Sequence, residues 1–399
     1  MKKILIVSHA MELGGAEKAL LGLLNNIDYH NYSVDLFLER HTGELLDYLP
    51  KKVNLLPEKT AYSCMAVPAS QVIKKGQLLV AAGRYIGKKK AVDYINNHSL
   101  RDGADVLISY SQKYTVDFMP MISDEEYDLV ISFLTPHYFA AKKTKGKVKI
   151  AWIHTDYSAI EADPDTEAEM WGMYDTIISI SPEVTKSFLN FLPSLENKIS
   201  FIPNMHPADF IRSESDKFVP DDEMPDDDSI KLLSIGRYCV AKNFDNLPFI
   251  CRDIIKKYGI NVKWYIIGYG TDEKLIEDNI QKAGMQDNVI LLGKKLNPYP
   301  YIKRCDFYVQ PSRFEGNAVT VNEALILNKC VAVTDYLTAR SQINNGVDGV
   351  IVPLENELCA EGLAEFIKNT QLQQQIKQNI SVTDFSNSHE IEKLYNLMR

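Results

Sequence analysis

The sequence predicts an α/β protein built from two doubly wound domains, each with a parallel sheet. Short apolar runs alternate with helix-length amphipathic segments through most of the 399 residues. Most of these runs are continuously apolar, as in parallel strands that helices cover on both faces. The chain is also too long for one ordinary core, so we expect two domains.

Ten apolar runs are the candidate strands, five on each side of a break near residue 205. Helix-length segments separate most successive runs, which indicates βαβ units and hence parallel sheets. The runs are residues 3–8, 32–38, 128–133, 147–153, 175–180, 231–235, 262–267, 288–292, 306–310 and 330–333.

A change in composition marks the boundary between the domains. Residues 205–229 contain the run VPDDEMPDDD, which is acidic, carries two prolines and has few apolar anchors. Such a segment is typical of a linker or surface loop. We therefore predict one domain over residues 1–205, a second over residues 206–380 that begins with the acidic linker 205–229, and a C-terminal helix over residues 381–399.

The overall composition excludes several classes of protein. A net charge of −9 disfavours binding to nucleic acid. The six cysteines form no CxxC pair, so neither a zinc site nor a disulfide framework is expected, and a reducing compartment is favoured. No run approaches the roughly 18 apolar residues of a membrane-spanning helix, and the first apolar run is too short for a secretory signal. We expect a cytoplasmic protein.

Residues 71–98 stand out as a basic segment, with six lysines and arginines against the single acid Asp93. Apolar residues recur in it at helical spacing, so it is expected to form a basic amphipathic helix. Such a helix can lie on an anionic membrane surface. Alternatively, its apolar stripe packs on its own domain and its lysines form a solvated face. The stripe consists of Leu78, Ala82, Tyr85, Val92 and Ile95.

The stretch from Pro311 to Leu325 is the most informative part of the second half. It follows a predicted buried strand and turns through Glu315-Gly316-Asn317, with Ala318 next, into a predicted helix. In an open α/β sheet, that turn lies where ligands bind, and the free N–H groups of the helix start suit a phosphate. Glu315 and Glu323, about two helical turns apart, could accept hydrogen bonds from sugar or ribose hydroxyls.

Two further elements of the second half fall at the same sheet edge. Gly236 and Arg237 end the first predicted strand, and Lys242 follows in the next loop. Two cations placed there could hold a diphosphate and stabilise charge on a departing one. Gly268, in the sequence Gly-Tyr-Gly after the next strand, would let a nucleotide approach the backbone.

The first half offers two candidate elements of its own. Gly14 and Gly15 open a predicted helix, where they permit close approach of a phosphate or sugar. No GxGxxG fingerprint is present, which disfavours a pyridine-nucleotide dehydrogenase. His154 ends a predicted strand and could bind a sugar hydroxyl, oriented by Asp156, although a lone histidine is more often structural.

Taken in order, these elements resemble family 4 glycosyltransferases, which have the GT-B fold of two Rossmann-like domains facing a central cleft. The family's Glu-x7-Glu motif is matched by Glu315 and Glu323, and its Arg-x4-Lys pair by Arg237 and Lys242. Gly-Gly-Ala-Glu at residues 14–17 and His154 also match segments of the family, and the likeness is most specific over residues 230–380. The chain departs from the family at Ala339 and Gln342, where many members have a glycine-rich loop and a glutamate.

The resemblance implies an N-terminal acceptor-binding domain, a C-terminal donor-binding domain, and a last helix that packs back on the N-terminal domain. It implies that Glu315 faces the donor sugar, that Glu323 binds the nucleotide ribose, and that Arg237 and Lys242 hold the diphosphate. The implied catalytic residues are His154, Glu315, Arg237 and Lys242. The implied donor-binding residues are Gly14, Gly15, Gly236, Gly268, Gly316, Asn317, Ala318 and Glu323.

The implied activity is that of a retaining hexosyltransferase. It would move a sugar from a UDP- or GDP-sugar to an acceptor hydroxyl of a glycan or lipid-linked saccharide in surface-glycan synthesis, at the inner face of the cell membrane. No cofactor and no metal are expected, because Asp163/Asp165 and Asp226–Asp228 are taken as solvated charge. The alternatives are another GT-B activity, such as a UDP-sugar 2-epimerase, and a non-catalytic nucleotide-sugar-binding protein.

Overall fold

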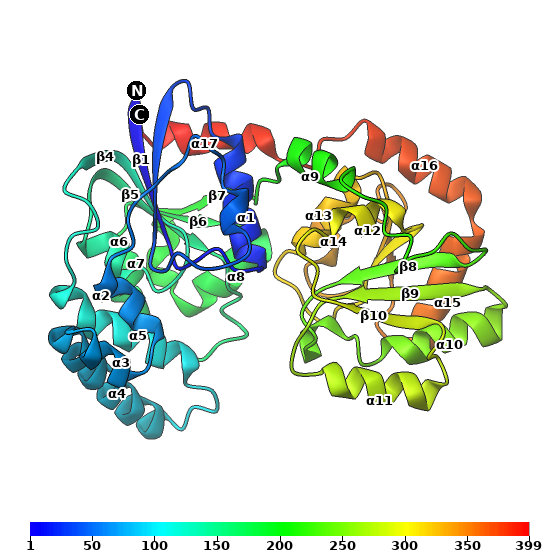
Figure 1. The fold of residues 1–399 in the computed structure, drawn as a ribbon, viewed down its shortest axis with the longest axis horizontal. Coiled ribbons are helices and arrows are strands. Elements are labelled where there is room, and N and C mark those ends of the chain that lie inside the picture. Colours follow the sequence, from blue (N-terminus) through cyan, green and yellow to red (C-terminus); the bar gives the residue numbers. More distant parts are fainter. Residues whose placement is uncertain (399) are drawn as a thin grey trace. The chain divides into compact units, whose positions relative to one another are not determined.

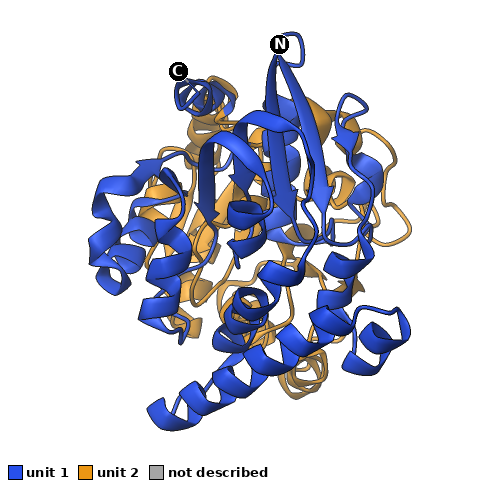
Figure 2. Ribbon diagram, turned by 90° about the vertical axis from the view of Figure 1, so that its left-hand side faces the viewer, with its two compact units in different colours: residues 1–205, 388–399 blue, residues 206–387 orange. Residues whose placement is uncertain are grey.

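The computed structural model describes residues 1–398, and the chain divides into two compact units. Unit 1 comprises Met1–Met205 together with Ser388–Arg399, and unit 2 comprises His206–Asn387 (Figure 2). Each unit has its own hydrophobic core.

Unit 1 is organised around a seven-stranded sheet in the order β3-β2-β1-β4-β5-β6-β7, in which neighbouring strands run parallel (Figure 1). Ile4, Leu5 and Ile6 of β1 are all completely buried, because this central strand is covered on both faces. The strands are β1 (Lys2–Ser8), β2 (Tyr32–Leu38), β3 (Asn54–Leu55), β4 (Glu126–Ser132), β5 (Lys145–Ile153), β6 (Thr176–Ser179) and β7 (Ile199–Phe201).

The helices of unit 1 include a long one, α4, within the segment that the sequence marked as basic. They are α1 (Gly15–Asn26), α2 (Thr60–Ser63), α3 (Ala69–Lys74), α4 (Leu78–His98), α5 (Ala104–Thr115), α6 (Tyr138–Lys142), α7 (Pro164–Gly172), α8 (Pro182–Phe191) and α17 (Ile391–Asn396).

Unit 2 contains a six-stranded parallel sheet in the order β10-β9-β8-β11-β12-β13. Its strands are β8 (Ile230–Ile235), β9 (Val262–Ile267), β10 (Val289–Gly293), β11 (Phe307–Gln310), β12 (Cys330–Thr334) and β13 (Val350–Val352). Its helices are α9 (Ala208–Ser215), α10 (Leu247–Tyr258), α11 (Glu273–Ala283), α12 (Tyr299–Arg304), α13 (Val319–Ile326), α14 (Ala339–Gln342), α15 (Asn356–Lys368) and α16 (Thr370–Ser381).

All ten strands that the sequence predicts are present, within two residues at either end. The sequence did not predict β3, β7 and β13, which have two or three residues each. Such short strands lack the length at which a run of apolar residues becomes distinctive.

The acidic segment expected as a linker is a packed part of unit 2. Residues 208–215 form α9, and Ile211 and Met224 are completely buried in the core of that unit. Asp227 forms ion pairs with Lys231 and Lys263, at 3.3 and 2.5 Å. Lys231 is four residues from Asp227, whereas Lys263 is 36 residues away, a partner that local composition could not reveal.

The expected helix over residues 381–399 is interrupted. The carboxylate of Asp384 accepts a hydrogen bond from the backbone N–H of Ser386, and Asn387 has a φ of 53°, so the chain turns before α17 begins at Ile391. The short helix α17 lies in unit 1, where the ring of Tyr395 stacks on that of Tyr32 with centroids 4.1 Å apart.

The helix α4 packs through a face that the sequence did not indicate. Its buried residues are Val80, Gly83, Gly87 and Ala91, a stripe of mostly small residues that faces α5. The predicted stripe is largely exposed instead: Leu78, Ala82, Tyr85 and Val92 lie at the surface, and Ile95 is partly buried. The interpretation that this stripe packs on its own domain is therefore wrong for four of its five residues.

Candidate functional site

The carboxyl ends of the strands β8, β11 and β12 lie side by side at one edge of the unit 2 sheet, because the three strands are neighbours and parallel. The loops that follow them carry the residues that the sequence marked as a donor site. These loops contain Gly236 to Lys242, Pro311 to Ala318, and Asp335 to Thr338.

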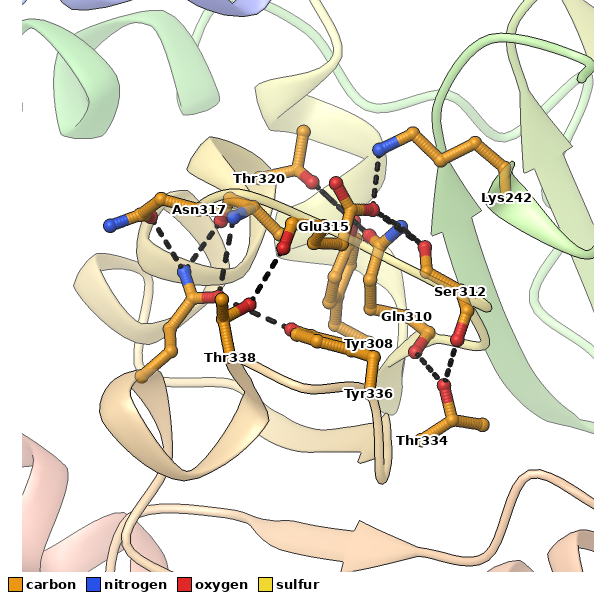
Figure 3. A network of polar contacts seen from close by, with 12 residues as sticks. Lys242, Tyr308, Gln310, Ser312, Glu315, Asn317, Thr320, Thr334, Tyr336 and Thr338 are labelled. Atoms are coloured by element: carbon orange, nitrogen blue, oxygen red, sulfur yellow. Dashed lines mark hydrogen bonds and ion pairs between the residues drawn. The ribbon is translucent and has the colours of Figure 1, made fainter. Parts of the chain in front are cut away.

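Glu315 is the centre of a polar network at this edge (Figure 3). Its Oε1 accepts hydrogen bonds from Lys242 Nζ at 2.5 Å, Ser312 Oγ at 2.6 Å and Gln310 Nε2 at 3.1 Å. Its side chain is only 9% exposed, so these three donors replace most of the water that the carboxylate has lost. Of the three, the sequence predicted only Lys242.

Gln310 connects this carboxylate to the core of unit 2. The side chain is completely buried, and its Oε1 accepts a hydrogen bond from the hydroxyl of Tyr308 at 2.6 Å. Because that oxygen accepts, the amide nitrogen is directed towards Glu315 and Ser312. Gln310 therefore holds Glu315 in position from inside the protein.

The turn after Glu315 is fixed by the segment in which the chain departs from family 4. Thr338 donates from Oγ1 to the carbonyl of Glu315 at 2.8 Å. Gln342 donates from Nε2 to the carbonyl of Ala318 at 2.7 Å and to Asn317 Oδ1 at 3.1 Å, and its Oε1 accepts from the N–H of Ala318 at 3.3 Å. An amide can both donate and accept, whereas an ionised glutamate could not make the two donated bonds.

The loop that carries Lys242 is attached to the loop after β11. Arg313 forms a bidentate ion pair with Asp245, with N···O distances of 2.8 and 2.7 Å, and donates to the carbonyl of Val240 at 2.6 Å. Arg237 in the same loop is exposed, and its guanidinium makes no ion pair with any described residue. The two predicted cations therefore differ: Lys242 is already paired, and Arg237 points to solvent.

The glycines after β8 and β9 lie where there is little room for a side chain. A Cβ at Gly268 would lie 1.9 Å from the carbonyl oxygen of Gly236, and one at Gly236 would lie 3.0 Å from the Lys242 side chain. Gly268 is thus explained by the close approach of the loops after β8 and β9, which is a different reason from the nucleotide contact that the sequence suggested.

Glu323 lies on α13 and is 1% exposed, and its Oε1 accepts a hydrogen bond from the hydroxyl of Tyr299 at 3.1 Å. In this state its carboxylate is part of the interior of unit 2. Its predicted contact with a ribose remains a prediction.

In unit 1, Gly14 and Gly15 stand at the start of α1 as predicted from the sequence. A Cβ at Gly15 would meet no atom within 4 Å, so the backbone is open to approach there. Nε2 of His154 is buried and has no hydrogen-bond partner among residues 1–398. Burial lowers the pKa of His154 to about 3, so the ring is neutral near pH 7. Asp156 does not orient it, because the Asp156 carboxylate accepts from Ser158 instead.

Sequence reasoning missed a second group of polar residues, buried or partly buried, at the same edge of the unit 1 sheet. His9 follows β1 and Glu39 follows β2, with 3.8 Å between His9 Nε2 and Glu39 Oε1, and Gln112 of α5 donates to Glu39 at 3.2 Å. Burial raises the pKa of Glu39 to about 8 and lowers that of His9 to about 4, so both are uncharged near pH 7. The contact with Gln112 joins residues far apart in the chain, so no local pattern indicates it.

Asp163, one of the acidic residues considered as a metal site, has a structural role. Asp163 caps α7 by accepting from the N–H of Asp165, and also accepts from Tyr110 and Thr166. It is buried, so the interpretation as solvated charge is wrong for Asp163. Over the described part of the chain, no group of three His, Cys, Asp or Glu residues could hold a metal ion.

Comparison with known proteins identifies the family of unit 2. Residues 216–382 match the family model of glycosyl transferases group 1. An uncharacterized glycosyltransferase of Methanocaldococcus jannaschii is 32% identical over 172 residues, which is 42% of each chain. The N-acetylgalactosamine-N,N'-diacetylbacillosaminyl-diphospho-undecaprenol 4-alpha-N-acetylgalactosaminyltransferase of Campylobacter jejuni is 28% identical over 37% of this chain and 40% of that protein. The matches thus span less than half the length of these relatives.

The fold as a whole matches that of the Anabaena protein HepE, whose crystal structure contains UDP and glucose. The identity is 15%, the TM-score is 0.67, and the match covers 99% of this chain and 100% of that one. The predicted GT-B class, with two parallel-sheet α/β domains, is therefore confirmed. Unit 2 carries a domain of the group 1 glycosyl transferases, as the motifs around Arg237, Lys242, Glu315 and Glu323 indicated.

Proposed function

We propose that the protein is a retaining, metal-independent hexosyltransferase of family 4, which transfers a sugar from a UDP- or GDP-sugar to an acceptor hydroxyl. The observation that supports this most is the contact between Lys242 and Glu315, 2.5 Å apart. It joins the two matched motifs, Arg-x4-Lys and Glu-x7-Glu, at the carboxyl edge of the unit 2 sheet, where open α/β sheets bind ligands.

The contact suggests how the donor enters. A diphosphate carries more negative charge than a carboxylate, so it competes for Lys242 and releases Glu315. The freed carboxylate then accepts hydrogen bonds from the sugar hydroxyls. Arg237 is exposed, with no ion-pair partner among the described residues, and supplies a second cation to the diphosphate.

In the proposed reaction, the bond between the anomeric carbon and the diphosphate oxygen breaks. The acceptor oxygen bonds to that carbon on the same face, and its proton passes to the departing diphosphate. Lys242 and Arg237 stabilise the charge that develops on the leaving group, so no metal is needed there. His154, neutral because of its lowered pKa, is proposed to hydrogen-bond a sugar hydroxyl.

We further propose that the acceptor is a lipid-linked saccharide and that the protein works at the inner face of the cell membrane in surface-glycan synthesis. The name of the Campylobacter jejuni relative describes transfer to a saccharide on diphospho-undecaprenol, which supports this acceptor class. No helix within residues 1–398 has the length and apolarity needed to cross a bilayer.

A thermal-shift screen tests the donor site. Purified protein is heated with UDP, GDP, UDP-glucose and GDP-mannose, with and without EDTA. A ligand at 100 times its Kd stabilises the folded protein by about 2.7 kcal/mol, which is readily detected. We expect one diphosphate to raise the melting temperature, with no effect of EDTA, and Arg237→Ala to remove most of the shift. Lys274→Ala, at an exposed lysine on α11, is the control that should keep it.

If no nucleotide moves the melting temperature, the donor site is absent and the proposal fails. If the donor binds and is consumed without any acceptor, a 2-epimerase becomes the better assignment. If it binds but is never consumed, with lipid-linked saccharides supplied, the protein is a non-catalytic binder.

A further inference from the structure

The outward face of α4 is unusually apolar for a helix at a protein surface. Large side chains line it, and each is well exposed, although monomeric proteins rarely leave such side chains grouped together in water. The exposed fractions are 63% for Leu78, 63% for Leu79, 71% for Tyr85, 42% for Ile86 and 40% for Val92. In Figure 1, α4 lies with α3 at the border of unit 1.

These side chains form two adjacent stripes on the helix. Leu78, Tyr85 and Val92 are seven residues apart, which is almost two full turns, so they lie above one another. Leu79 and Ile86 have the same spacing and form the neighbouring stripe. The face therefore runs continuously along α4 from Leu78 to Val92.

The packing of α4 explains why this face is left uncovered. The helix contacts α5 through its small residues, so closely that a Cβ at Gly83 would lie 2.6 Å from the carbonyl oxygen of Tyr114, and one at Gly87 the same distance from that of Tyr110. The large apolar side chains on the opposite face therefore stay exposed.

Lysines surround the apolar face. Lys74 and Lys75 precede α4, and Lys88 and Lys89 lie between Ile86 and Val92; all four are exposed. Asp93 is the only acid between residues 69 and 98. Arg84 does not belong to this face, because it donates to the carbonyls of Cys64 and Val67 at 2.6 and 2.7 Å.

We propose that this face, made of Leu78, Leu79, Tyr85, Ile86 and Val92 with the flanking lysines, binds the surface of an anionic lipid bilayer. Apolar side chains that enter the head-group layer and lysines that meet anionic head groups are the chemistry of an interfacial helix. The positive charge of the lysines favours binding to a negatively charged surface. The apolar stripes favour a surface with an accessible hydrocarbon layer. The inference deepens the proposed function, because a lipid-linked acceptor would lie in the same bilayer.

The test is co-sedimentation of the full chain with vesicles, which needs neither donor nor acceptor. We expect strong binding to vesicles of phosphatidylcholine mixed with phosphatidylglycerol, and weak binding to phosphatidylcholine alone. The double variant Leu79→Ser/Ile86→Ser should lose binding to both. Lys88→Gln/Lys89→Gln should weaken binding to the anionic vesicles by about fivefold for each lysine and flatten the dependence on phosphatidylglycerol.

Two control variants make the same kinds of substitution at positions outside this face. Val382→Ser changes an apolar residue that is 86% exposed, and Lys274→Gln an exposed lysine, both in unit 2. Both should bind vesicles like the unchanged protein. All of the substitutions are at exposed positions, and an unchanged melting temperature confirms that each variant folds.

The proposal is overturned if the protein ignores anionic vesicles, or if Leu79→Ser/Ile86→Ser binds them equally well. It is also overturned if the protein forms a dimer that this double variant abolishes and no vesicle binding is seen, because the face would then join two copies of the chain. A loss of vesicle binding with nucleotide binding intact would separate this result from a failure of the donor site.

Discussion

At the scale of single residues, Gln310 is expected to matter most among those that the sequence did not indicate. Its amide lies between the Tyr308 hydroxyl and Glu315, so Gln310→Met fills the space but leaves both without one partner. Tyr308 still donates to Thr320, and Glu315 still accepts from Lys242 and Ser312. The cost is therefore that of the two lost hydrogen bonds, about 0.5–1.5 kcal/mol each, and urea unfolding should show it. Gln375→Met, at an exposed position on α16, should change stability little. Equal stability of the two variants would mean that Gln310 does not hold Glu315.

Glu39 gives a prediction about pH. Burial raises its pKa to about 8, although the positive charge of Arg40 acts to lower it. The other groups around the carboxyl are His9, Tyr62 and Gln112. In the unfolded chain the carboxyl ionises near its ordinary value of about 4.3. Between these two values the folded state binds more protons, so stability falls as pH rises and levels off above the folded pKa.

Glu39→Gln cannot ionise and keeps an oxygen for Gln112 to donate to. Its free energy of unfolding should equal that of the unchanged protein near pH 4 and exceed it by a growing margin up to about pH 8. Urea unfolding across this range measures the difference, and Glu196→Gln at an exposed site is the control. A margin that does not grow with pH would show that Glu39 is ionised in the folded protein.

At the scale of elements, the contact between α4 and α5 depends on glycine. A Cβ at Gly87 would approach the carbonyl oxygen of Tyr110 to 2.6 Å, and backbone cannot move aside cheaply. Gly87→Ala should therefore destabilise unit 1 by about 1–3 kcal/mol, although alanine favours helix. Gly172→Ala at the end of α7, with nothing within 4 Å of the new Cβ, should be neutral or slightly stabilising. Calorimetry compares the two, and an unchanged melting temperature for Gly87→Ala would contradict the tight contact.

The positions of the longer strands could be predicted from the sequence, whereas the packing face of α4 could not. Continuous apolar runs located the ten longer strands, because burial on both faces leaves a strong local signal. The face of α4 could not be predicted, since periodicity counts large apolar residues whereas the helix packs through glycine and alanine. In the site, the motifs gave Lys242 and Glu315. Gln310 and Gln342 act through contacts between separate loops, which no local pattern records.

At the scale of the whole molecule, the chain returns to unit 1 after completing unit 2, and Tyr395 anchors this return. The ring is 5% exposed and stacks on Tyr32, and its hydroxyl accepts a hydrogen bond from the N–H of Asp28 at 2.8 Å. Tyr395→Ala should destabilise unit 1 by about 3–5 kcal/mol, as for other large buried aromatic residues. Tyr395→Phe keeps the stacking and should lose only about 1 kcal/mol.

Because the two units have separate cores, Tyr395→Ala is expected to affect unit 1 and not unit 2. Arg237, Lys242 and Glu323, which are proposed to hold the nucleotide, all belong to unit 2, whose core shares no residue with that of unit 1. Tyr395→Ala should therefore lower the calorimetric transition of unit 1 while the Kd for the nucleoside diphosphate, measured by titration calorimetry at low temperature, stays the same. A weaker Kd for Tyr395→Ala, with Tyr395→Phe unchanged, would show that the packing of α17 on unit 1 reaches the donor site and that the two units do not act as independent bodies.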